Sequence, residues 1–353
     1  MKSKLLHHLA GCMFLKDSDR SGQDYLQSIS PDAGSSSITA NHICEHPEYD
    51  LTVIIPVYNS EPFICRCLES IIRQKTSYRI CITVINDGST DRSGEIIDSY
   101  SGNPDIRVIS QENGGFSAAR NSGLRHIESR YITFVDSDDC LPDDETCLDT
   151  LLKTAYEYDA DIVQGGWEKF QDGKTLSTVR IPFNKDAERI AGYPWGKIYR
   201  SELWRNIRFP EKYWYEDTVI NMLIRPQCSR MVTIETIVYC YRINPAGITR
   251  SSIGKVKSLD TLYITKALIR DRIRLGLPMN EEALDDFFDQ IRMNIRRTLP
   301  LRDPLLQKCM FDEHLEIYLD VFSHIRTKKS RNRLLERALK QGSFRKYIIA
   351  AAF

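Results

Sequence analysis

The sequence has no long apolar run, no net charge and no regular cysteine spacing. No stretch approaches the ~20 apolar residues of a membrane-spanning helix, and 48 basic residues balance 48 acidic ones. Any attraction to nucleic acid or to a membrane must therefore be local. The ten cysteines form no metal-ligand array and follow no secretory leader. We therefore expect free thiols and a cytoplasmic protein.

Two glycine-rich motifs are also missing. No Gly-x-Gly-x-x-Gly pattern follows any predicted strand, which disfavours a dinucleotide-dependent oxidoreductase. The first predicted strand is followed by PVYNSEPF, where a sugar-1-phosphate nucleotidyltransferase needs a glycine-rich, basic loop. That enzyme class is therefore the less favoured alternative.

The stretch YITFVDSDD, residues 131–139, ends an apolar run at three carboxylates, Asp136, Asp138 and Asp139. The β-branched and aromatic residues predict a strand buried on both faces. Carboxylates so close together repel one another, and burial without a partner would be costly. A hard divalent cation such as Mn²⁺ or Mg²⁺ would neutralise them while keeping positions for water and phosphate. The alternative is a solvated acidic turn.

Further apolar runs at 51–57, 80–87 and 106–110 alternate with helical patterns, and the first run is expected to end at Pro56. Strand-helix alternation with unbroken apolar strands predicts an α/β fold, a three-layer α/β/α arrangement around a mainly parallel sheet. In such sheets ligands gather at the carboxyl ends of the strands. Tyr58, Asp87 and Asp136 all fall there, so we expect one site; alternatively, each residue merely ends its strand.

The later part of the chain carries weaker signals. Lys197 lies among aromatic residues that suit a sugar or phosphate surface, although core packing of Trp195 is equally open. Glu216 and Asp217 are expected in the first turn of a helix, where the helix dipole favours acids. From about residue 258 the pattern is amphipathic and helical throughout.

We expect three regions: a flexible leader over 1–48, the α/β domain over 49–252, and a helical region with a basic tail over 253–353. Residues 321–353 hold nine Lys or Arg against Glu336 alone. Such a tail could lie on an anionic membrane, making the protein peripheral at the inner face, or be a solvated face of a helical bundle.

The motifs VIIPVYN, VINDGSTD, NGGFSAARNSG and FVDSDD occur in that order. They closely resemble the nucleotide-binding half of the family 2 glycosyltransferases, which have the GT-A fold. The segments WGKIYRSELW, YEDTVI and ITRS resemble the acceptor half of the same family, so the resemblance covers about residues 50–252.

The resemblance implies an inverting transfer from a nucleoside-diphosphate sugar, a UDP-sugar, with Mn²⁺ or Mg²⁺. The acceptor would be a saccharide or lipid-linked saccharide in surface polysaccharide synthesis. A non-catalytic nucleotide-binding or scaffolding module of the same fold is the alternative.

The resemblance also implies residue roles. Pro56, Tyr58 and Glu61 would surround the base, with Asp87 accepting from its N–H and Arg120 near the same pocket or the diphosphate. Asp136 and Asp138 would form the DxD pair around Ser137, Asp138 being the direct metal ligand. Asp217 matches the general base, and the adjacent Glu216 is not excluded; Lys197 and Arg250 would contact phosphate.

Overall fold

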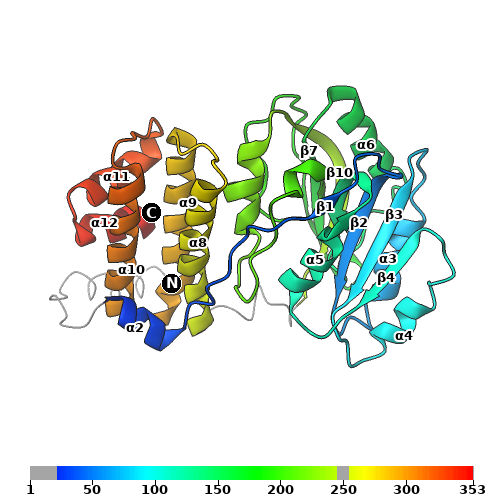
Figure 1. Cartoon of the computed structure of the whole chain (residues 1–353), viewed down its shortest axis with the longest axis horizontal. Helices are drawn as coiled ribbons and strands as arrows, with labels where there is room; N and C mark the ends of the chain where they lie inside the picture. Colours follow the sequence, from blue (N-terminus) through cyan, green and yellow to red (C-terminus); the bar gives the residue numbers. More distant parts are fainter. Residues whose placement is uncertain (1–21, 245–253, 353) are drawn as a thin grey trace. The chain divides into compact units, whose positions relative to one another are not determined.

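The computed structural model describes residues 22–244 and 254–352, which form two compact units (Figure 1). The sheet unit comprises residues 37–211 and 219–244, and the helical unit comprises 22–36, 212–218 and 254–352. Among the described residues, no helix combines the length and apolar character needed to cross a bilayer.

This division differs from the three consecutive ranges expected from the sequence. The range expected to be a leader contains helix α2 (Gly22–Ile29) and strand β1 (His42–Ile43). Both elements have partners far along the chain: β1 pairs with β5 (His126–Ile127), and the Tyr25 hydroxyl in α2 donates to Asp303 Oδ2 at 2.6 Å. The boundaries of functional domains stay a prediction.

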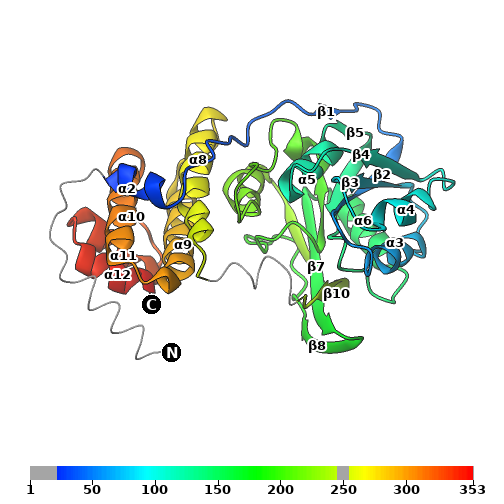
Figure 2. The ribbon, with the colours of Figure 1, turned by 90° about the horizontal axis from the view of Figure 1, so that it is seen from below.

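Within the described residues, the sheet unit is built on an eight-stranded mixed sheet with the order β10-β7-β9-β6-β2-β3-β4. Strand β8 pairs with β7 as a hairpin, which Figure 2 shows. Only β8 and β9 are antiparallel to their neighbours. The strands are β2 (Tyr49–Val57), β3 (Ile80–Asn86), β4 (Ile106–Ser110), β6 (Ser129–Phe134), β7 (Ile162–Gln171), β8 (Lys174–Val179), β9 (Lys197–Arg200) and β10 (Met231–Arg242).

Helices cover both faces of this sheet, so the predicted three-layer α/β/α fold is confirmed. On one face, α3 (Ile64–Ile72), α4 (Ser93–Asp98) and α6 (Cys147–Tyr158) pack on alternate residues of the strands, such as Val53 and Val84. On the other face lies α5 (Phe116–Leu124), whose Gly123 sits against Ile54. A Cβ at Gly123 would come within 2.6 Å of Ile54 Cγ2, so this close helix–strand packing needs glycine.

Strand β2 continues one residue beyond Pro56, where the sequence predicted a loop. Pro56 still pairs in register with Ile85 of β3. On the other side, the Ile54 carbonyl accepts from the Val135 N–H, and the pairing of β2 with β6 ends there. Peptide groups two residues apart face the same neighbour, so the missing N–H of Pro56 falls where no ladder bond is required. The prediction that a loop begins at Pro56 was therefore wrong, because the strand ends at Val57.

The helical unit confirms the helical pattern predicted for the carboxyl-terminal region. Its helices are α2, α8 (Asp260–Arg274), α9 (Glu281–Thr298), α10 (Pro304–Ile317), α11 (Arg333–Lys340) and α12 (Phe344–Ala352). Side-chain caps start two of them: Asn280 accepts from the Ala283 N–H, and Asp303 accepts from the Leu306 N–H. Their inward faces bury large apolar side chains, including Phe287, Phe288 and Phe311.

Candidate active site

The candidate nucleotide residues of the sheet unit lie at one edge of the sheet. Strands β2, β3 and β6 are neighbours and run parallel, so their carboxyl ends meet at the same edge. Tyr58 follows β2, Asp87 follows β3, and Asp136 stands two residues beyond β6. The structure therefore brings these three predicted residues to a common edge.

The loops after β2 and β3 are tied together by hydrogen bonds. The Asn59 N–H donates to Ser89 Oγ at 3.1 Å, and Asn59 Oδ1 accepts from the Thr90 N–H at 2.8 Å. The Glu61 N–H donates to Asp91 Oδ2 at 3.0 Å, which adds a third link. The linked loops after β2 and β3 form a preformed corner of the site. Pro56 is buried beneath this corner, and the Tyr58 side chain is half exposed, at 50 %.

Asp87 is buried and orders the loop that precedes α5. Its Oδ1 accepts from Gln111 Nε2 at 2.7 Å and from the Gly114 N–H at 2.9 Å, and its Oδ2 accepts from the Gly115 N–H at 2.8 Å. Next to it, Gly88 has φ of 71°, and a Cβ there would lie 2.9 Å from the Asn113 nitrogen. A carboxylate offers about four acceptor positions, so Asp87 can take one more donor in addition to its structural role.

Arg120 and Asp136 form an ion pair that the sequence analysis did not predict. Arg120 Nη2 lies 2.6 Å from Asp136 Oδ1, and the guanidinium stacks near the rings of Phe116 and Phe209. The Arg120 side chain is 6 % exposed and that of Asp136 is 27 % exposed. Helix α5 therefore supplies a buried positive charge to one of the two DxD carboxylates.

Asp138 has a different environment. Its Oδ2 accepts from Asn244 Nδ2 at 3.1 Å, and its backbone carbonyl accepts from Arg242 Nε at 2.6 Å. Burial, and then the nearby Asp136 carboxylate, raise the pKa of Asp138 above its usual value. An additional positive charge at Asp138 would stabilise its ionised form.

The remaining residues of the DSDD turn fix it in place. Asp139 is buried, and its carboxylate accepts from the Tyr239 hydroxyl at 2.7 Å and from the Arg242 N–H at 2.6 Å. Ser137 Oγ lies 2.7 Å from Ser60 Oγ, so it shares a hydrogen bond with the loop after β2. Of the three acids, Asp139 is the structural one, and Asp136 and Asp138 are the two that are partly accessible.

The carboxylates of Asp136 and Asp138 fit a hard divalent cation whose coordination shell is completed by water and phosphate oxygens. In the described ranges, no three His, Cys, Asp or Glu side chains come together as a full metal site. When Mg²⁺ or Mn²⁺ also binds substrate phosphates, the protein usually supplies one or two carboxylate ligands. Asp136 already pairs with Arg120, so Asp138 is the better candidate for direct contact with the cation.

Of the two predicted phosphate contacts, Lys197 is not exposed at this surface. Lys197, in β9, is fully buried, and its ammonium donates to the carbonyl oxygens of Ala191 and Tyr193 at 2.6 and 2.8 Å. Sequence alone does not distinguish a buried lysine of this kind from an exposed one. Arg250 lies outside the described residues.

The two candidate bases belong to the helical unit. Glu216 and Asp217 lie in a turn directly before a helical segment, and not within its first helical turn as predicted. The preceding Tyr215 has φ of 69°, which no helical residue adopts. Glu216 is buried, at 9 % exposure, whereas Asp217 is more exposed. Asp217 is therefore the more accessible carboxylate of the pair.

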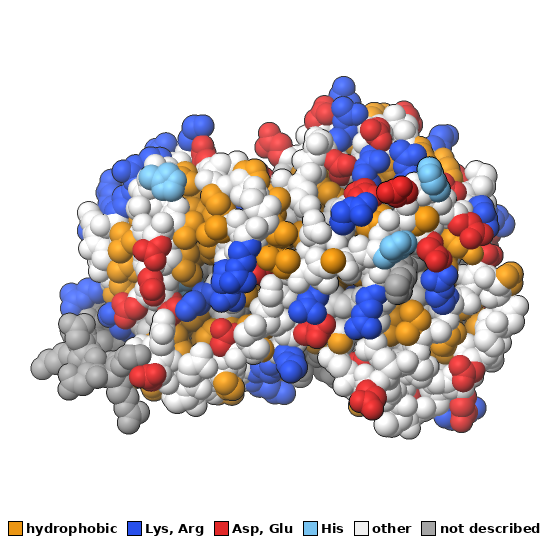
Figure 3. Space-filling model, in the orientation of Figure 1, with side chains coloured by type: hydrophobic (Ala, Val, Ile, Leu, Met, Phe, Trp, Pro, Cys, Tyr) orange, Lys and Arg blue, Asp and Glu red, His pale blue; other side chains and the backbone are white. Residues whose placement is uncertain are grey.

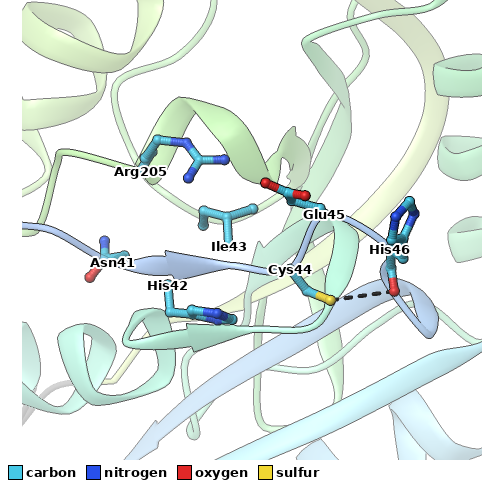
Figure 4. A pocket seen from close by; sticks show the side chains of 7 residues that line it. All are labelled: Asn41, His42, Ile43, Cys44, Glu45, His46 and Arg205. Atoms are coloured by element: carbon cyan, nitrogen blue, oxygen red, sulfur yellow. Dashed lines mark hydrogen bonds between the residues drawn. The ribbon is translucent and has the colours of Figure 1, made fainter.

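A separate hollow on the sheet unit is lined by Asn41–His46 and Arg205 (Figure 4). The Cys44 thiol donates to the His46 carbonyl oxygen at 3.3 Å there. None of the residues predicted from the sequence lines it, so we assign it no part in the candidate active site.

Residues 52–217 match the family described as glycosyl transferase family 2. The chain is 36 % identical to glycosyltransferase GlyA of Streptococcus pneumoniae over 57 % of its length and 31 % of that protein. It is 34 % identical to the uncharacterized glycosyltransferase EpsJ of Bacillus subtilis over 56 % of its length and 62 % of that protein. The aligned region thus spans between about a third and three fifths of these relatives.

Among solved structures, the chain is similar in fold to S. aureus TarS, residues 1–349, crystallised in complex with UDP. The TM-score is 0.65 at 20 % identity, covering 86 % of this chain and 90 % of that one. The α/β fold, the ordered strand-end motifs and the family match all agree. The chain therefore carries a family 2 glycosyltransferase domain with the GT-A fold.

Proposed function

We propose that this protein is an inverting glycosyltransferase that moves a sugar from a nucleoside-diphosphate sugar, a UDP-sugar, to a saccharide or lipid-linked saccharide of a surface polysaccharide. The proposal depends above all on Asp136 and Asp138, two partly accessible carboxylates at the sheet edge that also carries Tyr58. The TarS structure with UDP supports the choice of uridine.

The nucleoside end of the donor is assigned to the preformed corner. The half-exposed Tyr58 ring stacks on the base, Asp87 accepts a base N–H with its remaining acceptor position, and Pro56 and Glu61 border the pocket. A corner that is already hydrogen-bonded loses little conformational freedom when the nucleotide binds, which favours affinity.

The diphosphate end is assigned to the DSDD turn. Asp138 and Asp136 are the ligands for Mn²⁺ or Mg²⁺, which when bound stabilises negative charge on the departing diphosphate. Arg120 pairs with Asp136 and fixes its orientation, and Ser137 ties the turn to the loop after β2. Lys197 and Arg250 stay proposed phosphate contacts; for Lys197, phosphate oxygens would have to replace two carbonyl oxygens.

Inversion requires a base on the acceptor side, which removes the hydroxyl proton as the oxygen attacks the anomeric carbon. Asp217 is assigned this role because it is the more exposed of the two adjacent acids. Glu216 is the second candidate and is buried.

Replacing Tyr58 with Ala should weaken donor binding by about 1–3 kcal/mol, about 5- to 150-fold, because a base loses its stacking partner. Tyr58→Phe keeps the ring and should bind nearly as tightly as the wild type. Isothermal titration with UDP and UDP-sugars in the presence of Mn²⁺ measures both.

The control is Phe183→Ala, which removes an equally exposed aromatic ring, at 52 %, from the same unit. It should leave donor affinity unchanged. If no nucleoside diphosphate binds to the wild type with Mn²⁺, the enzyme assignment is wrong and a non-catalytic module of this fold takes its place.

We further propose that the protein contacts anionic membrane through the basic tail. Arg333, Arg337 and Lys340 of α11 are exposed, whereas the apolar residues Leu335 and Leu339 are buried in the helical unit. Figure 3 shows Lys and Arg side chains gathered over the part of the surface where Figure 1 draws α11. Contact of this kind depends on charge and weakens with salt.

Co-sedimentation with phosphatidylserine vesicles should fall at least several-fold in Arg333→Glu/Arg337→Glu, and in the wild type at high salt. The variant Lys174→Glu/Lys185→Glu carries the same change of charge on exposed residues of the sheet unit. It should sediment like the wild type; equal loss in both variants would rule out a specific role for α11.

A further inference from the structure

Arg297 of α9 lies against the turn that carries Glu216 and Asp217. Its guanidinium carbon is 3.6 Å from the centre of the Tyr215 ring, and its Nη1 donates to Thr261 Oγ1 of α8 at 2.8 Å. A planar cation over an aromatic face combines attraction to the ring with directed donors. Arg297 therefore joins the residue next to the two acids to the helices of the same unit.

The partner of Arg297 is itself held by a buried polar chain. Thr261 Oγ1 is hydrogen-bonded to the Asn294 amide at 2.7 Å, and that amide lies 3.0 Å from His314 Nε2. The other ring nitrogen of His314 is 2.7 Å from the Tyr347 hydroxyl. All these side chains have exposures of 0 %, and satisfied buried networks of this kind are rigid.

The turn has a second attachment one residue before Tyr215. The Trp214 N–H donates to Asp260 Oδ2 at 2.7 Å, and Lys257 Nζ lies 2.8 Å from the same oxygen and donates to the Lys212 carbonyl at 2.9 Å. The backbone before the acids is therefore anchored at Lys212 and Trp214, and Arg297 acts at the next point along it.

Arg297 interacts electrostatically with the acids of the turn, Glu216 and Asp217. Burial lowers the pKa of Arg297, and the Asp217 carboxylate is the largest influence that opposes this shift, followed by Tyr215 and Glu216. A desolvated guanidinium needs compensating negative charge nearby. The two acids supply it, so the cation and the turn stabilise each other.

We infer that Arg297 is a positioning residue for Asp217: the helical unit, through Arg297, holds the base-bearing turn in the orientation needed for proton removal. This inference rests on the proposed function. It gives the helices beyond the family 2 match at residues 52–217 a part in the reaction. A misplaced base typically costs about 10²-fold in rate for a displacement near 1 Å.

The test compares Arg297→Ala, Arg297→Gln and Arg297→Lys with Arg296→Ala, which removes the neighbouring, exposed arginine of the same helix. We expect kcat to fall about 10- to 100-fold in the Ala and Gln variants, while the donor Kd and KM change less than about twofold. Arg297→Lys should recover part of the rate, and Arg296→Ala should match the wild type.

Hydrogen exchange of the amides at 212–217 gives a readout that does not depend on activity. It should be faster in Arg297→Gln than in Arg296→Ala, with unchanged exchange at the strand-end loops. Arg297→Gln keeps a polar hydrogen-bond donor, on a shorter and uncharged side chain, so it serves if Arg297→Ala does not fold.

Wild-type kcat in Arg297→Gln, alongside an inactive Asp217→Asn variant, would overturn this inference and leave the proposed function intact. Equal losses of kcat and donor affinity would also overturn it, because the arginine would then be a general structural residue. An active Asp217→Asn variant would instead refute the base assignment itself, and the inference with it.

Discussion

Replacing Asp217 with Asn is expected to slow sugar transfer by about 10²- to 10⁴-fold. The amide has nearly the same shape as the carboxylate but cannot take the proton of the acceptor hydroxyl. Donor binding does not involve this proton, so the donor Kd should stay within about twofold of the wild type. Initial rates with a UDP-sugar and Mn²⁺, together with calorimetry, measure the two effects separately.

Glu216→Gln is the matched control for this change. Glu216 is adjacent and buried, so its amide variant should keep most of the activity if Asp217 is the base. The reverse result, an inactive Glu216→Gln and an active Asp217→Asn, would transfer the role to Glu216.

Replacing Asp138 with Asn is expected to lower kcat by about 10²- to 10³-fold, the usual effect of losing one group that stabilises developing charge. It should also remove the Mn²⁺ dependence of nucleoside-diphosphate binding. Burial and Asp136 raise the pKa of Asp138, so a cation at this carboxylate relieves an unfavourable environment. UDP titrations with Mn²⁺ and with EDTA test this directly.

Asp143→Asn provides the comparison, because Asp143 lies five residues further along and its side chain is 91 % exposed. It should bind UDP with the same Mn²⁺ dependence as the wild type. If Asp138→Asn keeps that dependence too, the metal is not held by the DSDD turn.

The sequence predicted the sheet well because its strands are marked by local patterns. Unbroken apolar runs identified β2, β3 and β6, and the turn residues after them marked the carboxyl edge. The amphipathic period likewise identified the helices from α8 onward. These signals act within about ten residues, and tertiary structure did not override them.

The contacts that decide the site were not predictable in the same way. The Arg120–Asp136 pair depends on how α5 packs on β2, and the bond between Asp139 and Tyr239 joins residues a hundred positions apart. Lys197 looks like a surface cation in the sequence and is buried in β9. The sequence likewise did not predict the positive φ of Tyr215, with which the helix begins only after the two acids.

The helical unit also sets an order of events during synthesis. The partners of its amino-terminal part are synthesised much later. The Tyr25 hydroxyl donates a hydrogen bond to Asp303, and the Tyr263 hydroxyl donates one to the Ser30 carbonyl. At about 5–20 residues per second, the 278 residues between the first pair take about 14–56 s to emerge from the ribosome. An eight-residue helix such as α2 is marginal by itself. The nascent chain therefore exposes this segment for most of translation, and a fragment truncated at residue 252 would leave it, and the turn at 212–217, permanently without their docking helices.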